Sequence, residues 1–243
     1  GVVAASQTLQ MLVDAIAAAG GPRYEWRQIN PVNNRDGGEP GGNIRTVFLF
    51  DPARVEFVEG SLSRLTDPNA TASNDGALQS SRKPLVGSFV FNGETITLVG
   101  NHFNSKGGDQ PLYGPTQPPV LTSEAQRMQQ AAIVKAFVDG QLAADPNAKI
   151  LVLGDLNDFQ FSNPLNLLES AGLSTLIETL PLGERYTYNY QGNAQALDHV
   201  LASAGLMPQL RGFDVVHMNS EFIDQISDHD PVIARFFIER AGQ

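Results

Sequence analysis

Residues 149–158 read KILVLGDLND, an apolar run that ends in a glycine followed by two aspartates with an asparagine between them. The apolar run predicts a buried strand over 149–154. Asp155 and Asn157 stand two positions apart on an extended segment, so both side chains point the same way and can offer oxygen to one hard cation. A polar turn after the strand is the alternative, because Asp and Asn are common in turns.

Three further polar segments lie beside apolar runs, namely 101–104 (NHFN), 197–199 (LDH) and 227–230 (SDHD). Three of the four histidines of the chain fall in these segments. Antiparallel neighbours would bring such segments to a common edge of the sheets. Packing alone does not explain this clustering, so the segments predict a catalytic site.

The residue types in these segments suit acid–base and metal chemistry. Asp228 and His229 place a carboxylate beside an imidazole, whose ordinary pKa is about 6.5. Asp198 lies in an apolar strand, where an unpaired charge is costly, so it needs a partner such as a histidine that it orients. His102 follows an apolar run and is placed to serve as a general acid. Each residue taken alone also fits a solvated loop or a structural hydrogen bond.

The composition excludes several classes of protein. A chain of 243 residues with 42% hydrophobic and 17% charged residues is typical of one globular domain. The absence of cysteine excludes disulfides, thiolate nucleophiles and cysteine-ligated zinc. No apolar run is long enough to span a membrane. The net charge of -10 opposes bulk attraction to a polyanion, so a phosphodiester substrate would need a local cation and a few basic side chains.

Hydrophobic periodicity predicts three helices and six core strands. The helices are expected over 8–19, from Ser123 onward, and over 163–168. Ser123 is the expected N-cap of the second helix, with Gln126 in the capping-box position. The strands are expected over 44–50, 85–91, 95–100, 149–154, 197–202 and 231–238, with loops at 33–42, 64–81 and 105–119. Asn92-Gly93 between two apolar runs predicts a hairpin. Hairpins mixed with helices favour an α/β fold of two packed sheets flanked by helices.

Six segments in order resemble the endonuclease/exonuclease/phosphatase superfamily, close to its bacterial extracellular-nuclease-like branch and more distantly to pancreatic-type deoxyribonuclease. They are GGNIRTVFLFDP, SSRKPLVGSF, GNHFNSKG, VLGDLNDF, LDHVLAS and SDHDPV, between about residues 41 and 232. One such motif is weak support, whereas six in order are strong. The resemblance implies a four-layer α/β sandwich of two mixed, mainly antiparallel sheets flanked by helices.

The resemblance also implies a role for each matching residue. Asp155 and Asn157 would contact the phosphate, the metal or the attacking water, and Asp228 would be a metal ligand. His229, paired with Asp198, would hold the scissile phosphate or act as general base. The second histidine, which protonates the leaving oxygen, would be His102. The residues implied as substrate contacts are Arg45, Arg82, Asn104 and Lys106.

Members of the superfamily begin with a strand that carries an asparagine and a second strand that ends in a metal-binding glutamate. We expect Gly1 to follow that glutamate directly, because Glu25, Glu39 and Glu56 stand in a different context. We therefore expect a single domain over 1–243 that lacks its N-terminal strand or strands and is impaired as an enzyme. The branch resemblance further predicts a secreted or periplasmic location.

These observations predict a divalent-metal-dependent phosphodiester hydrolase, a nuclease acting on DNA or RNA, with Mg²⁺, Mn²⁺ or Ca²⁺ as cofactor. The alternatives are a non-catalytic domain of the same fold that binds a phosphorylated ligand or a protein, and a phosphatase or lipid phosphodiesterase. The sequence shows no apolar membrane-inserting loop in favour of the lipid enzyme. The sequence does not decide whether the substrate is DNA or RNA, whether cleavage is endonucleolytic or exonucleolytic, or what the oligomeric state is.

Overall fold

A computed structural model describes residues 3–37 and 43–240 of the chain. They form two compact units. The first unit contains the described residues up to His102 together with residues 238–240, and the second unit contains residues 103–237. The expected single domain stays a prediction.

The first unit consists of one helix and six strands. They are α1 (Ser6–Ala18), β1 (Glu25–Arg27), β2 (Phe48–Phe50), β3 (Glu56–Phe57), β4 (Ser63–Arg64), β5 (Leu85–Phe91) and β6 (Glu94–His102). Strands β3, β4 and β6 all pair with β5, and β1 pairs with β2. The predicted hairpin at Asn92-Gly93 is confirmed, since both residues have positive φ, 54° and 82°, as its tight turn requires.

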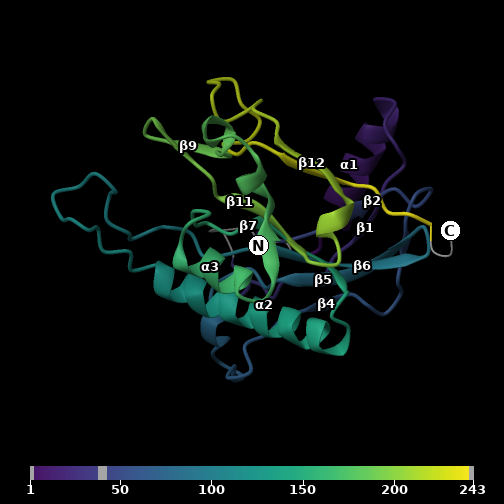
Figure 1. Ribbon diagram of the computed structural model, residues 1–243, viewed down its shortest axis with the longest axis horizontal. Coiled ribbons are helices and arrows are strands. Elements are labelled where there is room, and N and C mark those ends of the chain that lie inside the picture. Colours follow the sequence, from purple (N-terminus) through teal and green to yellow (C-terminus); the bar gives the residue numbers. More distant parts are fainter. Residues whose placement is uncertain (1–2, 38–42, 241–243) are drawn as a thin grey trace. The chain divides into compact units, whose positions relative to one another are not determined.

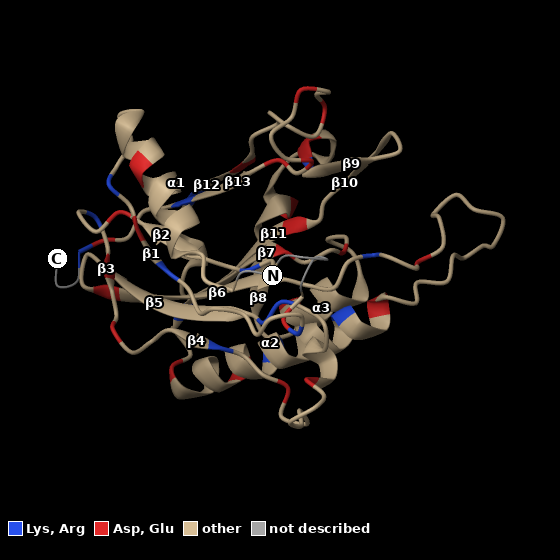
Figure 2. Cartoon of the chain, turned by 180° about the vertical axis from the view of Figure 1, so that it is seen from behind, with Lys and Arg blue, Asp and Glu red and all other residues tan. Residues whose placement is uncertain are grey.

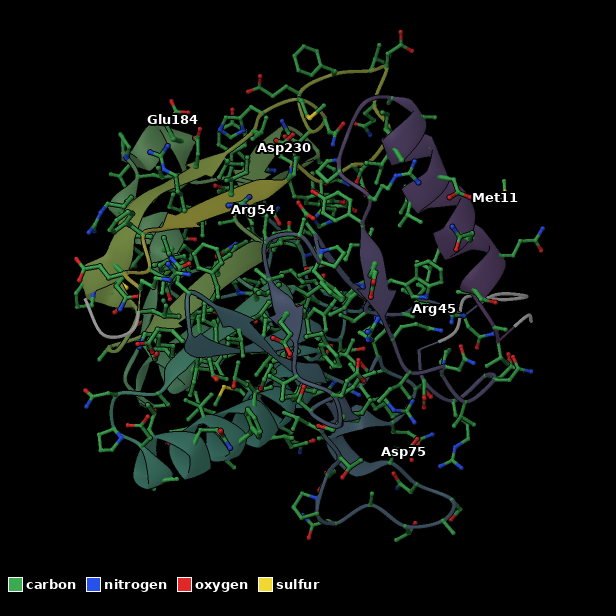
Figure 3. All side chains as sticks on the ribbon, turned by 90° about the vertical axis from the view of Figure 1, so that its right-hand side faces the viewer. Met11, Arg45, Arg54, Asp75, Glu184 and Asp230 are labelled. Atoms are coloured by element: carbon green, nitrogen blue, oxygen red, sulfur yellow. The ribbon has the colours of Figure 1, made fainter. Side chains whose placement is uncertain are left out.

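Helix α1 confirms the predicted N-terminal helix within two residues at its start. Leu9 and Val13, four positions apart, are its buried residues. Met11 lies on the outer side of the helix (Figure 3) and is 65% exposed. The helix ends before Gly20, whose φ of 88° is the left-handed conformation that glycine adopts at low cost.

The core of the first unit is an aromatic cluster. Phe48, Phe50, Phe57 and Phe89 pack with ring centroids 5.3 to 6.1 Å apart, three of the four contacts edge-on. The predicted strand over 44–50 is shortened to β2, because the ladder with β1 ends at the Arg27–Phe48 pair.

The segment 64–81 was expected to be an exposed polar loop, and this was wrong in part. Ala77 and Leu78 are buried. Lys83 Nζ lies 2.9 Å from an oxygen of buried Asp36 and 3.1 Å from Asp75, and Arg64 also pairs with Asp36. Burial alone would raise the pKa of Asp36, but the hydrogen bond and charge of Lys83, with Arg64, lower it. These ion pairs fasten the segment to the unit.

The second unit has two α-helices and seven strands. They are α2 (Glu124–Ala144), β7 (Lys149–Asp155), α3 (Asn163–Glu169), β8 (Leu173–Thr175), β9 (Tyr188–Tyr190), β10 (Asn193–Gln195), β11 (Asp198–Ser203), β12 (Leu210–Val215) and β13 (Val232–Phe236). Strand β11 lies between β7 and β8, and β9–β10 and β12–β13 form two further pairs. Helices α2 and α3 lie on one side of the β7–β11–β8 sheet, and β12 and β13 lie on the other (Figure 1).

The α2 helix differs from its prediction in detail. Ala131, Val134 and Val138 are fully buried, and the charged side chain of Arg127 is fully buried with them. Ser123 is the N-cap residue, yet its side chain makes no capping hydrogen bond, because it bonds Asp109 and Arg127 instead. A buried ion pair network explains both differences.

The mixed α/β class with several sheets and helices is confirmed. Every strand pairing within either unit, as far as the structure describes them, is antiparallel. Within residues 3–37 and 43–240, no helix combines the length and apolar character that a membrane crossing requires.

Candidate active site

Two carboxylates meet where β7 ends and β11 begins. Asp155 is the last residue of β7, Asp198 is the first of β11, and the two are register partners across the antiparallel pair. Asp198 was expected inside its strand. This was wrong, because Asp198 is the first residue of β11. Side chains so paired lie about 5 Å apart at Cβ, so their charges repel unless a proton donor or a cation lies between them.

His229 supplies a partner to one of these carboxylates. Its Nδ1 lies 2.6 Å from Oδ2 of Asp198. Thr187 donates its hydroxyl to the same oxygen at 2.7 Å, and the Thr187 oxygen accepts the backbone N–H groups of Leu197 and Asp198. Because Asp198 is held by Thr187, it fixes the imidazole in one orientation.

The pKa of His229 is raised above its ordinary value of 6.5. Burial would lower this pKa, but the hydrogen bond with Asp198 and the charges of Asp198, Asp155 and Asp228 outweigh burial. The ring is only a quarter exposed and lies 4.7 Å from the ring of Tyr188. The imidazole therefore keeps its proton to a higher pH than a free histidine does, beside two carboxylates.

Asn157 completes the group from the segment that follows β7. Its backbone N–H donates to Oδ1 of Asp155 at 2.8 Å, and its amide nitrogen donates to Oδ2 at 3.2 Å and to the carbonyl of Phe103 at 3.1 Å. The residue has a φ of 51°, a left-handed conformation that asparagine tolerates. The turn therefore holds the Asp155 carboxylate in place.

The donor set fits a hard divalent cation. Ligand atoms of Asp155, Asp198 and His229 all lie within 4.8 Å of one another. Magnesium and manganese prefer carboxylate and amide oxygens, which Asp155 and Asn157 carry. Asp228, the expected ligand, is exposed and does not belong to this three-residue group. Its role as a ligand stays a prediction.

Two of the expected substrate contacts lie in the second unit. Lys106 Nζ lies 3.2 Å from Asp158 and 4.4 Å from the centroid of the Phe159 ring. The backbone N–H of Asn104 donates to the side-chain oxygen of Gln130, while its amide nitrogen donates to the carbonyl of Ser105. Lys106 lines the same cleft as Asn157 and His229.

The other expected site residues belong to the first unit. His102 is the last residue of β6. Arg45 donates to Gln28, Asn30 and the carbonyl of Val3, and burial lowers its pKa. Figure 3 labels Arg45 among the side chains of this unit. The roles of His102, Arg45 and Arg82 in catalysis stay predictions.

Three positions named from the sequence, Gly41 and Gly42 of the first motif and Glu39, lie outside the described residues.

A buried ion network that sequence reasoning missed supports the site. Arg127 is fully buried, with Nε 2.7 Å from Asp158 and an amino nitrogen 3.3 Å from Asp109. It also contacts the carbonyl of Ser105. Fully buried His199 has Nε2 2.8 Å from the carbonyl of Asp158, which agrees with a structural role. The network ties the loop after residue 103 to the turn that carries Asn157.

Asp230, two positions after Asp228, is a structural carboxylate. Its Oδ1 accepts the backbone N–H groups of Met218, Asn219 and Ser220, and its Oδ2 accepts the Ser220 hydroxyl. Burial would raise its pKa, but these hydrogen bonds and His217 lower it to about 2. Asp230 therefore holds the loop that leads back to His229.

A cleft of about 690 Å³ opens beside the cluster and was not foreseen. The loop over 105–113 and the β9–β10 hairpin line it, together with Asn157, Phe159 and His229. In Figure 1 the loop projects to the left and the hairpin lies above it. Tyr188 and Tyr190 also line this cleft. Their two-residue spacing in a strand was the signal, because it places both rings on one face.

The loop over 218–226 carries exposed apolar side chains, although the sequence had indicated no apolar membrane-inserting loop. Ile223 and Ile226 are almost fully exposed, and Phe222 is half exposed. Glu221 and Asp224 stand among them, and acidic residues colour much of this region red in Figure 2. This mixture of acidic and apolar residues does not suit an anionic membrane surface.

Comparisons with known proteins concern the family and the fold of the chain. The sequence model described as Endonuclease/Exonuclease/phosphatase family matches residues 66–230, more than half of the chain. No curated protein sequence matches the chain.

Solved structures share the fold at low sequence identity. The mannosyl-6-phosphatase of Bacteroides thetaiotaomicron is 17% identical, covers 95% of this chain and 82% of its own, and gives a TM-score of 0.60. The human nocturnin catalytic domain with bound sulfate is 14% identical, with coverages of 96% and 78% and a TM-score of 0.61. TDP2 of D. rerio, complexed with a single-strand DNA product, is 15% identical, with coverages of 94% and 91% and a TM-score of 0.59. The predicted sandwich fold class is confirmed.

Proposed function

We propose that this chain, which belongs to the endonuclease/exonuclease/phosphatase family, is a divalent-metal-dependent phosphodiester hydrolase that acts on a nucleic acid. The observation that carries the proposal is the Asp198–His229 pair, at 2.6 Å, beside the Asp155 carboxylate and the Asn157 turn. A domain that only binds a phosphorylated ligand has no use for an imidazole that a carboxylate orients.

His229 is suited to move a proton. Its Nδ1 is engaged by Asp198, so the neutral ring carries its proton there and presents Nε2 as an acceptor. His229 lines the cleft, where Nε2 can take a proton from water or, once protonated, hold an oxygen of the scissile phosphate. The neighbouring carboxylates raise the pKa of His229, which favours the protonated ring that can hold a phosphate oxygen.

The expected cofactor has a fitting set of ligands in Asp155 and Asn157. A bound Mg²⁺ or Mn²⁺ would supply positive charge to the phosphate oxygens as negative charge builds up on them. Asp155 is held by two hydrogen bonds from Asn157, so its carboxylate is already oriented. Asp198 instead engages His229 and Thr187, so we assign Asp198 to positioning the imidazole.

The cleft supports a substrate larger than a phosphate group. Its volume of about 690 Å³ corresponds to roughly twenty water molecules at about 30 Å³ each. A phosphodiester with nucleosides on one or both sides fits this space better than an isolated phosphate. The similar fold of TDP2, crystallised with a single-strand DNA product, points the same way. The similar fold of a mannosyl-6-phosphatase makes a sugar phosphate monoester the competing substrate.

The test is to incubate the chain with single-stranded DNA, plasmid DNA, RNA and a sugar phosphate monoester, each with Mg²⁺, Mn²⁺ or a chelator. The proposal predicts metal-dependent cleavage of at least one nucleic acid and a much slower release of phosphate from the monoester. Rapid hydrolysis of the monoester without cleavage of any nucleic acid would assign the chain as a phosphatase. Inactivity on all four would favour a binding domain.

A further inference from the structure

We propose that the cleft holds an unpaired nucleobase against the rings of Tyr188 and Tyr190, so that the substrate is a single-stranded nucleic acid. This inference rests on the proposed function and names its substrate class. It comes from the side chains that line the cleft, none of which carries the hydrolysis itself apart from His229 and Asn157.

The rings of the two tyrosines are stacked and nearly parallel. Their ring planes lie 11° apart and their centroids 6.2 Å apart on β9. Strand β10 pairs with β9 from Gln195–Tyr188 to Asn193–Tyr190 and holds the rings at this spacing. Tyr190 is 51% exposed, so part of its face is open to a ligand. Stacking on an aromatic face is how single-stranded nucleic acids are bound without regard to sequence.

The tyrosine rings lie next to His229, the histidine that we propose to be catalytic. The ring of Tyr188 lies 4.7 Å from that of His229, and the backbones of the two residues form an antiparallel bridge. Tyr190 extends the surface along the hairpin. A phosphodiester held at His229 therefore has an aromatic surface for the base of a neighbouring nucleoside.

The other segments that line the cleft add groups that suit a base. Phe159 stacks on Phe161, with ring planes 20° apart, and Lys106 lies over Phe159. Amide side chains from both sides, Gln110, Gln191, Asn193 and Gln195, line the cleft as well. An amide both donates and accepts hydrogen bonds, as the edge of a base does, and such edges are open only when the base is unpaired.

The charges around the cleft favour stacking over electrostatic attraction. Lys106 and Arg127 pair with Asp109 and Asp158, so this group of two cations and two anions is neutral. The chain as a whole carries a net charge of -10. A duplex hides the faces of its bases and is bound mainly through phosphates, so this cleft offers it little. Affinity for a single strand should therefore change little with salt.

The experiment is fluorescence anisotropy with a labelled single-stranded oligonucleotide, in chelator to prevent cleavage. The comparison ligands are a strand of equal length made of abasic sites and a duplex. The variants are Tyr190→Leu, which removes the flat ring, and Tyr190→Trp, which keeps a flat ring. Phe237→Leu is the matched control, because Phe237 is an exposed aromatic residue, 56% exposed, that does not line the cleft.

We expect the wild-type chain to bind the strand with bases at least about tenfold more tightly than the abasic strand or the duplex. Tyr190→Leu should lose most of that difference, whereas Tyr190→Trp and Phe237→Leu should keep it. The fluorescence of the introduced tryptophan should be quenched by the strand with bases and not by the abasic strand. Equal affinity for all three ligands, or no effect of Tyr190→Leu, would overturn the inference.

A separate assay distinguishes this inference from the proposed function. Metal-dependent cleavage of bis-p-nitrophenyl phosphate by the wild-type chain, with no preference for bases in the binding assay, would overturn the base site and leave the hydrolase. Base-dependent binding without cleavage of any diester would uphold the base site and overturn the hydrolase.

Discussion

The Nδ1 atom of His229 lies 2.6 Å from Oδ2 of Asp198, and Asp198 stands opposite Asp155 in the register of β11 and β7. This relationship brings together Asp155 and His229, which lie 74 positions apart in the chain. Asp198 bonds the imidazole of His229, and Asp155 lies beside Asn157, where we propose that it binds a cation.

Asp198→Asn should impair catalysis without preventing folding. The amide keeps the shape but cannot hold the imidazole in the same tautomer, and the comparable change in a serine protease costs about 10⁴-fold in kcat. We expect a loss of at least about a hundredfold in kcat and a smaller change in KM. Circular dichroism checks the fold, and a kcat within threefold of the wild-type value would contradict the assignment.

The pH dependence should reveal the same pair. The pKa of His229 is raised above 6.5, so activity that needs the neutral ring should rise with a midpoint above pH 6.5. Removing the carboxylate in Asp198→Asn removes the largest raising influence, so this midpoint should move to lower pH. The measurement is kcat/KM against pH for both chains, with the histidine titrations followed by NMR. A midpoint that stays in place would show that another group titrates.

The sign of the stability effect follows from the same shift. A histidine whose pKa is raised in the folded state stabilises the fold fully below its unfolded pKa of about 6.5. That contribution is lost as the pH rises through the raised value.

Metal binding should depend on Asp155 more than on Asp228. A ligand present at a hundred times its Kd stabilises the folded chain by about 2.7 kcal/mol, so saturating Mn²⁺ should raise the Tm of the wild-type chain. Asp155→Asn should abolish most of this rise. Asp228→Asn, at an exposed position outside the three-residue group, should keep more of it. If Asp228→Asn lost more of the Mn²⁺-induced rise in Tm than Asp155→Asn, Asp228 would be the principal ligand.

The buried ion network should be sensitive to the loss of one partner. Arg127→Met leaves buried Asp109 and Asp158 with Lys106 as their remaining cation, and breaking a buried ion pair in this way costs about 3–5 kcal/mol. Lys135→Ala, which breaks an exposed pair with Asp139 on the same helix, is the matched control and should cost less than about 0.5 kcal/mol. Urea unfolding of both variants measures the difference, and equal costs would contradict the network.

Asp230 should make the chain sensitive to acid. Its pKa of about 2 lies below the ordinary 3.8, so its contribution is present above pH 3.8 and is lost as the pH falls toward 2. Asp230→Asn should remove about 2 kcal/mol at neutral pH and flatten the decline of stability between pH 4 and 2. Figure 3 labels Asp230 among the side chains of its unit. If the stability of both chains declined equally between pH 4 and 2, the Asp230 carboxylate would contribute nothing to stability.

Local patterns in the sequence were enough to predict the elements that form from neighbouring residues. The β5–β6 hairpin was predictable because Asn92-Gly93 specifies its turn, and β7 was predictable because its apolar run is continuous. The short strands β1, β3, β8 and β12 were not predicted, because they exist through pairing with distant residues.

The same contrast holds for the site. Asp155, Asp198 and His229 could be named from the sequence because charged residues beside apolar strands are conspicuous. Arg127 could not, since a single arginine in an amphipathic helix reads as a solvent-facing residue until Asp109 and Asp158 are brought to it. The aromatic cleft also depends on tertiary structure, because Phe159 and Tyr190 come from different elements.

We propose that the Asp155, Asp198 and His229 cluster hydrolyses phosphodiesters with a divalent cation. The most direct test is the rate of cleavage of bis-p-nitrophenyl phosphate by the wild-type chain and by His229→Ala, in Mn²⁺ and in chelator. We expect a rate that requires the metal and falls by more than about tenfold in His229→Ala. A metal-dependent rate that survives this substitution within tenfold would contradict it.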